Sequence, residues 1–193
     1  GDLIHRMYFQ ATLGAHVQDN PGALMIDNVE CEIGGQRIDK HSGFWMEVWA
    51  ELTEPNPAAA VGECEGASGT RGTLFQHMSG MGGVAGTSDT PVIYVPLQFW
   101  FCRNPGLALP LIALQYHEVK INVTWNSATA SAPTACELFV DYIYLDTDER
   151  RRFAQQSHEY LIEQVQEQSL LGQTTNDLNF NHPVKELVWV ADT

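Results

Sequence analysis

Hydrophobic and polar residues alternate along several short segments of this chain, and such alternation predicts β-strands with one buried face. In residues 115–125, for example, Val119, Ile121 and Val123 share one side of an extended chain, while Lys120 lies on the other. The same pattern predicts strands at residues 3–13, 25–33, 36–39, 92–101, 137–145 and 159–166. Short strands separated by turns, with little helix, predict an all-β antiparallel sandwich.

One segment has the spacing of a helix instead. Apolar residues recur there about every three to four positions, at Trp45, Val48, Trp49 and Leu52. Ser42 stands where an N-cap is expected, and Pro55 prevents the helix from continuing. We therefore predict one short helix whose two tryptophans pack into the core rather than form a ligand platform.

Glycine and proline mark the turns. Gly34 and Gly35 separate two extended runs, which predicts a tight hairpin or bulge with positive φ angles, and Pro96 predicts an edge or bulge position. Residues 56–91 are rich in Gly, Ser, Thr and Ala and predict a long surface insertion. This region has no lysine for a phosphate-binding loop, and Thr70 replaces the last glycine of a G-x-S-x-G nucleophile elbow.

The polar segments near the end of the chain predict a short helix and a linker. Thr147 is a candidate N-cap, followed by two acidic residues that favour a helix N-terminus. The three arginines at 150–152 form a solvated helical turn in one interpretation and an ion-pair contact between domains or subunits in the other. Residues 167–177 are mostly polar, and a new patterned segment begins at Leu178.

The histidines do not form a recognisable metal site. His117 and Glu118 match the start of the zinc-protease motif H-E-x-x-H, but position 121 is Ile. We instead predict that His117 is a hydrogen-bonded, partly buried strand residue. The seven histidines are isolated from one another in sequence, at positions 5, 16, 41, 77, 117, 158 and 182. We predict no enzyme activity and no catalytic, cofactor-binding or metal-binding residue; Asn122, in the sequon Asn122-Val123-Thr124, is a candidate N-glycosylation site.

Charge and cysteine content narrow the range of functions. The chain has 24 acidic and 10 basic residues, a formal net charge of −14, so its surface repels phosphate backbones and direct nucleic-acid binding is not expected. The four cysteines are widely spaced and include no C-x-x-C pair. Free thiols are expected, and widely spaced disulfides are the alternative.

Four blocks of the sequence resemble, in the same order, the major capsid proteins of large nucleocytoplasmic DNA viruses, which include algal phycodnaviruses and iridoviruses. The blocks are IGGQRIDKH at 33–41, NPGLALPLIALQYHEVK at 104–120, VDYIYLD at 140–146 and FNHPVK at 180–185. They are long and nearly uninterrupted, so the resemblance is much more specific than a short catalytic motif.

The resemblance implies a jelly-roll sandwich that is part of a double jelly roll. Compared with the family pattern, residues 1–166 resemble the first jelly roll without its N-terminal strands. Residues 167–177 then correspond to a linker, and residues 178–193 to the start of the second jelly roll. The chain also begins at Gly1, inside a patterned segment, so we expect a piece of a longer polypeptide.

The same resemblance implies a structural role. Family members form homotrimers of pseudo-hexagonal outline, and these capsomers tile an icosahedral shell assembled in the host cytoplasm. Neighbouring capsomers, minor capsid proteins and a nearby internal viral membrane are the implied partners, without direct contact with nucleic acid and without a cofactor. The alternative is a carbohydrate-binding jelly-roll module on the virion surface, which would use loop 56–91.

Overall fold

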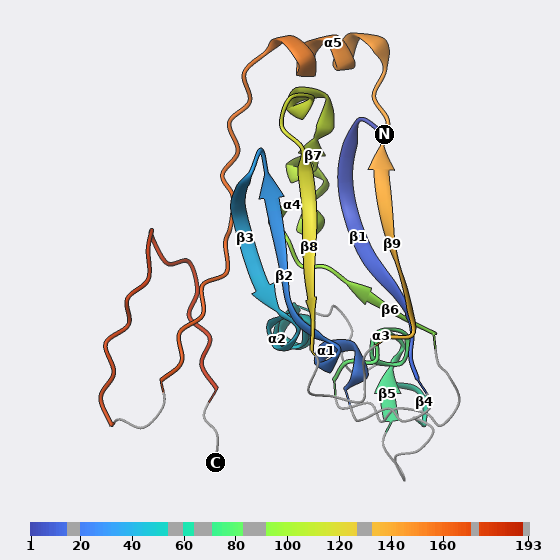
Figure 1. Cartoon of the computed structure of the whole chain (residues 1–193), viewed down its shortest axis with the longest axis vertical. Coiled ribbons are helices and arrows are strands. Elements are labelled where there is room, and N and C mark those ends of the chain that lie inside the picture. Colours follow the sequence, from blue (N-terminus) through green and yellow to red (C-terminus); the bar gives the residue numbers. More distant parts are fainter. Residues whose placement is uncertain are drawn as a thin grey trace.

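The computed structural model describes residues 1–14, 20–53, 60–63, 71–82, 92–126, 133–170 and 174–190. Its centre is a sandwich of two antiparallel sheets (Figure 1). In the first sheet, β1 is the central strand, with β9 on one side and β6 and β7 on the other. These strands are β1 (Leu3–Thr12), β6 (Val92–Pro96), β7 (Leu109–Pro110) and β9 (Ala135–Ile143).

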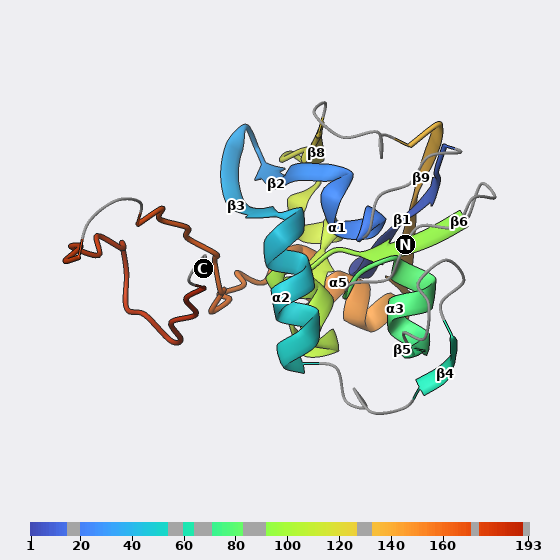
Figure 2. The same cartoon turned by 90° about the horizontal axis from the view of Figure 1, so that it is seen from below.

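The second sheet has the order β3-β2-β8. Its strands are β2 (Ile26–Ile33), β3 (Gln36–Ser42) and β8 (Val119–Trp125). Short helical elements lie at the two ends of the sandwich and, in the case of one turn, at its middle (Figures 1 and 2). They are α1 (Pro21–Leu24), α2 (Gly43–Thr53), α3 (Leu74–Ser79), α4 (Trp100–Arg103), α5 (Thr147–Gln155) and the 3₁₀ turns η1 (Pro105–Leu107) and η2 (Leu111–Leu114).

The hydrophobic core lies between the two sheets. Phe9 of β1 contacts Trp125 of β8 across the sandwich, with ring centroids 5.8 Å apart. Phe99 and Phe101 are completely buried and stack with centroids 5.6 Å apart. Val29 of β2 is also completely buried, and burial of such side chains is the main favourable term in folding.

Several sequence predictions are confirmed. The segments predicted at 3–13, 25–33 and 137–145 form β1, β2 and β9. The helix at Trp45 is α2, and the Ser42 Oγ accepts a hydrogen bond from the Trp45 N–H at 3.1 Å, as expected for its N-cap. Pro96 ends β6, an edge strand that pairs with β1, as predicted.

The prediction of one strand over residues 92–101 is wrong beyond Pro96. Residues 100–103 form α4, and this turn buries both Trp100 and Phe101, which neighbouring positions of a strand would direct to opposite faces. The strand predicted at 115–125 begins only at Val119, because His117 is in a turn and its backbone N–H donates to the Leu114 carbonyl. In residues 92–101, apolar residues would occupy both faces of a strand, and this pattern fits a buried helical turn equally well.

The strand predicted at 159–166 is also absent from the structure. This segment is extended beside β3 but forms no backbone ladder with it. The Val165 N–H instead donates to the side-chain Oδ1 of Asp39 at 3.0 Å, and the Gln164 side chain donates to the Ile38 carbonyl. A carboxylate has taken the place of the backbone acceptor that a strand would need.

The glycine-rich insertion contains more structure than its composition predicted. A hairpin of β4 (Ala60–Glu63) and β5 (Arg71–Thr73) leads into α3. Thr73 and Gln76 form a capping box at the start of α3, and this pair of residues is a helix-start signal at the level of the sequence. The N-cap of α5 is Asp146 rather than the predicted Thr147, since the Asp146 carboxylate accepts from the Glu149 N–H at 2.8 Å.

Gly34 and Gly35 have φ angles of 60° and 82°, so the predicted positive φ is confirmed at both. We expect Gly35→Val to lower the free energy of unfolding by more than about 1 kcal/mol, because a β-branched residue is strained in this region. A Cβ at position 35 would meet nothing within 4 Å, so a steric clash is not the cause. Chemical denaturation of the intact protein measures this loss. Gly35→Asn is the control and should lose much less; equal losses would contradict the explanation.

Candidate functional sites

The residues considered for metal binding do not come together. His117 is exposed in the turn before β8, so the prediction of a partly buried strand histidine is wrong. Within the described part of the chain, no group of three or more His, Cys, Asp or Glu side chains is placed to hold a metal ion. Position 16 lies outside the described residues.

Cys31, Cys102 and Cys136 are free thiols, as predicted. Burial raises the pKa of both Cys31 and Cys102 to about 12, which keeps these thiols protonated and unreactive at neutral pH. Cys64 lies outside the described residues, as does most of the loop proposed for carbohydrate binding.

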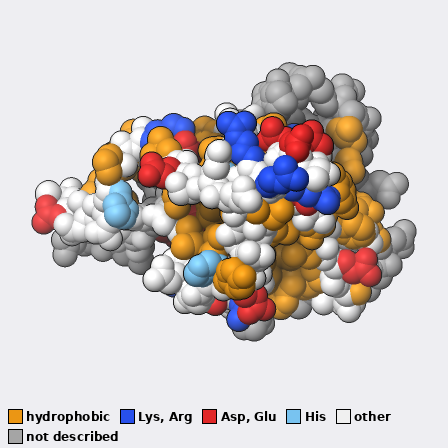
Figure 3. Space-filling model, turned by 90° about the horizontal axis from the view of Figure 1, so that it is seen from above, with side chains coloured by type: hydrophobic (Ala, Val, Ile, Leu, Met, Phe, Trp, Pro, Cys, Tyr) orange, Lys and Arg blue, Asp and Glu red, His pale blue; other side chains and the backbone are white. Residues whose placement is uncertain are grey.

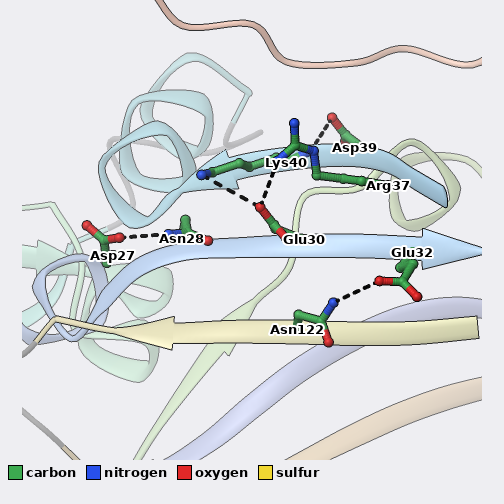
Figure 4. A network of polar contacts seen from close by, with 8 residues as sticks. All are labelled: Asp27, Asn28, Glu30, Glu32, Arg37, Asp39, Lys40 and Asn122. Atoms are coloured by element: carbon green, nitrogen blue, oxygen red, sulfur yellow. Dashed lines mark hydrogen bonds and ion pairs between the residues drawn. The ribbon is translucent and has the colours of Figure 1, made fainter. Parts of the chain in front are cut away.

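Asn122 lies on the outer face of the β3-β2-β8 sheet. Its side-chain amide donates to the Glu32 Oε2 at 3.4 Å (Figure 4), and Asn122 and Thr124 of the sequon are both exposed. Glycosylation at Asn122 stays a prediction.

The same outer face is polar and carries ion pairs. Glu30 of β2 lies between two cations of β3, at 3.2 Å from Arg37 and 3.7 Å from Lys40 (Figure 4). Exposed pairs of this kind contribute only about 0–1 kcal/mol each. This surface has the character expected for contact with water.

The outer face of the sheet formed by β6, β1, β7 and β9 carries exposed aromatic side chains. Tyr8 and Phe139 are directly opposite on β1 and β9. On the other side of β1, Tyr94 of β6 is opposite Gln10, which lies two residues along β1 from Tyr8. Val92, Tyr94 and Phe139 retain 40–46% of their exposure, and the Tyr8 hydroxyl donates to Asp141 at 2.7 Å. We call these residues the aromatic face. Exposed aromatic side chains grouped on one sheet are typical of a protein interface.

A third feature is an apolar hollow between the two sheets. β8 pairs with β2 and β9 pairs with β1, and among the described strands neither has a second partner. The sheets diverge on this side (Figure 2), leaving a cavity of about 460 Å³. Most of its lining is apolar and includes Ile4, Met7, Val119, Ile121, Leu138 and Val140, and the polar residues His117 and Glu118 line it as well. Inner-face side chains of a sandwich are normally covered, so we expect a further segment to pack against the hollow.

At the end of the sandwich where α5 lies, basic and acidic side chains are exposed beside hydrophobic ones (Figures 1 and 3). Arg150 Nε lies 2.9 Å from Asp2 Oδ2, which ties α5 to the start of β1 within the same chain. The hydrogen bond from the Leu145 N–H and then the contact with Arg150 lower the pKa of Asp2. Arg151 is exposed and pairs with Asp148 in its own helix at 3.6 Å.

Sequence reasoning missed a buried polar cluster between β3 and α4. Asp39 and His41 are 3% and 2% exposed, and the Arg103 guanidinium lies 4.2 Å from the ring centre of Trp49. Burial raises the pKa of Asp39 to about 6 and lowers the pKa of His41 to about 3, so the imidazole is neutral at pH 7. The alternating polar residues of β3 could have revealed these side chains, but they did not indicate that the face is buried.

Two family models together match nearly the whole chain. The model described as the N-terminus of major capsid proteins matches residues 1–146, and the model of large eukaryotic DNA virus major capsid proteins matches residues 149–193. The chain belongs to this capsid protein family. Among the described residues of this capsid protein, no helix combines the length and hydrophobicity needed to cross a membrane.

Individual relatives agree with the family models. The capsid protein is 50% identical to the major capsid protein of Pyramimonas orientalis virus, in an alignment covering 98% of the chain and 49% of the relative. It is 42% identical to the major capsid protein of Paramecium bursaria Chlorella virus 1, covering 88% of the chain and 40% of the relative. The chain therefore spans half or less of the length of these relatives.

The structure also matches a solved capsid. Superposition on a chain of the quasi-atomic model of the PBCV-1 virus capsid gives a TM-score of 0.63 at 38% identity, covering 85% of this chain and 40% of the other. The predicted all-β antiparallel jelly-roll sandwich is confirmed by this match, and its place in a double jelly roll stays a proposal.

Proposed function

We propose that the capsid protein is a structural subunit of a viral shell, and that it forms homotrimers of pseudo-hexagonal outline which tile an icosahedral lattice. The observation that carries this proposal is the structural match to a chain of an assembled virus capsid at 38% sequence identity. Closed symmetry allows one surface patch to be used repeatedly in such a shell. The role is architectural, without an enzymatic reaction or a cofactor.

The domain organisation is part of the same proposal. Residues 1–166 belong to the first jelly roll, 167–177 form the linker, and 178–193 begin the second jelly roll. The matched relatives are about twice as long as this chain or longer, which is consistent with a second sandwich in them. The exposed apolar residues of the last segment, which include Leu187 and Trp189, also support its need for further partners.

The aromatic face is the surface we assign to contact between sandwiches. Tyr94 and Phe139 are exposed on this face. The outer face of the β3-β2-β8 sheet instead carries charged side chains that already pair with one another, such as Arg37 and Glu30. Neighbouring capsomers and minor capsid proteins are the proposed partners, with an internal viral membrane nearby and assembly in the host cytoplasm. A net charge of −14 favours contacts with proteins over contacts with nucleic acid.

The intact protein encoded by the gene should therefore behave as a trimer at micromolar concentration, with little stable monomer. Obligate interfaces of this kind bury on the order of 2,000–5,000 Å², so subunit folding and association are coupled. Multi-angle light scattering measures the mass directly. Tyr94→Asp should shift the protein toward monomers or unfolded chains, whereas Thr124→Asp on the polar face should not. Detection of only monomer in the parent protein would contradict the proposal.

A further inference from the structure

The segment from Glu163 to Gln168, which we call the strap, lies between the sandwich and the last described residues of the chain. It follows α5 and passes beside β3, and the chain then moves away from the sandwich (Figure 1). Its sequence is EQVQEQ, with glutamine at every second position. In an extended segment, alternate residues share one side.

The strap is fixed to the sandwich by charged and buried groups. The Val165 N–H donates to Asp39 Oδ1 at 3.0 Å, and Arg103 Nη1 donates to Glu163 Oε2 at 2.9 Å. Asp39 is almost completely buried and Arg103 is packed against Trp49, so these anchors belong to the rigid part of the fold. Ile162, immediately before the strap, packs against the core.

Two glutamines of the strap bind the backbone of residues 177–185, which run back beside the strap and which we call the returning segment. Gln166 accepts from the Asn181 N–H at 2.9 Å and donates to the Asn181 carbonyl at 3.3 Å. Gln168 accepts from the Asn179 N–H at 3.0 Å and donates to the Asp177 carbonyl at 2.8 Å. Each side-chain amide therefore uses both its acceptor and its donor on the main chain.

The spacing explains why this arrangement works. A primary amide presents a carbonyl and an N–H group as a peptide unit does. Residues two apart in extended chain are separated by roughly 6.6–6.8 Å, and this holds both for Gln166 and Gln168 and for Asn179 and Asn181. The glutamine side chains thus take the place of one strand in a short β-ladder.

Glu163 connects the sandwich to the returning segment. Its Oε2 contacts Arg103 of the sandwich, and its Oε1 contacts the Lys185 ammonium of the returning segment. The hydrogen bond from Lys185, with a smaller contribution from Arg103, lowers the pKa of Glu163 and keeps it ionised. One carboxylate is therefore shared by cations from both parts of the chain.

We propose that the strap is a rigid joint, in which Gln166, Gln168 and Glu163 hold residues 177–185 at a fixed direction relative to the sandwich. A polar linker without such bonds would behave as a flexible chain. If the proposed double jelly-roll organisation is right, on which this last step rests, the joint sets the angle between the two jelly rolls.

Hydrogen exchange of the intact protein tests the joint. We expect the Asn179 and Asn181 amides to be protected in the parent and to exchange at least about tenfold faster in Gln166→Met/Gln168→Met. Methionine has a similar length, but it cannot donate to the carbonyls and its thioether is only a weak acceptor for the Asn179 and Asn181 N–H groups. The Val165 amide should remain protected in the variant, because its acceptor Asp39 is unchanged. Gln115→Met makes the same chemical change at an exposed glutamine outside the strap and should alter the exchange of neither the Asn179 nor the Asn181 amide.

The possible results distinguish a failure of the proposed joint from a failure of the proposed function. Rapid exchange at Asn179 and Asn181 in the parent, or equal exchange in parent and double variant, would overturn the joint even if trimers form. Loss of Val165 protection in the double variant would also overturn it, since the effect would then not be confined to the glutamine ladder. Absence of trimers in the parent would instead contradict the proposed function and leave the exchange result valid.

Discussion

Residues 1–193 expressed alone are expected to aggregate or to remain loosely packed. The hollow between the sheets leaves apolar inner-face residues uncovered, and Leu138 and Tyr142 of β9 retain 41% and 43% of their exposure. Among the described strands, β8 and β9 also have no partner on their outer edges beside these side chains, an arrangement that recruits other chains. The exposed segment around Trp189, 80% accessible, adds a further apolar surface.

Two measurements on the isolated chain check this expectation. Amide NMR should show poor dispersion or broad signals, and thermal denaturation should show no cooperative transition. The control is the intact protein from the same gene, which should melt cooperatively. A dispersed spectrum together with a cooperative melt of residues 1–193 alone would mean that the hollow needs no further strands. The proposed domain organisation would then have to be redrawn.

Phe99→Ala should lower the free energy of unfolding of the intact protein by about 3–5 kcal/mol. Phe99 is completely buried, stacks on Phe101 and contacts the His41 ring at a centroid distance of 4.6 Å. Its removal leaves a cavity in the centre of the core and also removes a neighbour of an uncharged, buried imidazole. A loss of this size is a large part of a typical domain stability of about 5–15 kcal/mol.

Phe44→Ala is the matched control for this substitution. Phe44 lies on α2 and keeps 58% of its exposure, so the same change should alter the stability by no more than about 0.5 kcal/mol. Denaturant titration of both variants, under conditions where unfolding is reversible, compares them directly. Similar losses for the two variants would show that Phe99 does not occupy the core position that we assign to it.

Much of the fold was predictable because its signals are local. Alternating residues marked β1, β2 and β9, and the apolar residues of α2 recurred at helical spacing behind the N-cap Ser42. Gly34 and Gly35 showed the hairpin because a positive φ is easy only for glycine. The family resemblance came from long, ordered blocks of residues, which carry more information than any single motif.

Other features of the fold could not be predicted from local sequence patterns. The apolar run at 92–101 has the composition of a strand, and the burial of both Trp100 and Phe101 by one helical turn depends on the sheets that surround it. The segment 159–166 alternates like a strand but forms no ladder, because the Asp39 carboxylate accepts the Val165 N–H. Whether such a segment forms a strand depends on contacts between residues more than a hundred positions apart in the sequence, such as Asp39 and Val165.

The sequence by itself therefore determined β1, β2 and β9, the turn at Gly34 and Gly35, and the family, since these depend on residues that are neighbours in the chain. The tertiary structure decided which polar residues are buried, and it placed Asp39 and Arg103 where they bind Val165 and Glu163 of the strap. It also revealed the aromatic face and the apolar hollow, because the exposure of Phe139 or Leu138 depends on which sheet covers it. Periodicity shows which residues share a face of a strand, and only packing shows what that face contacts.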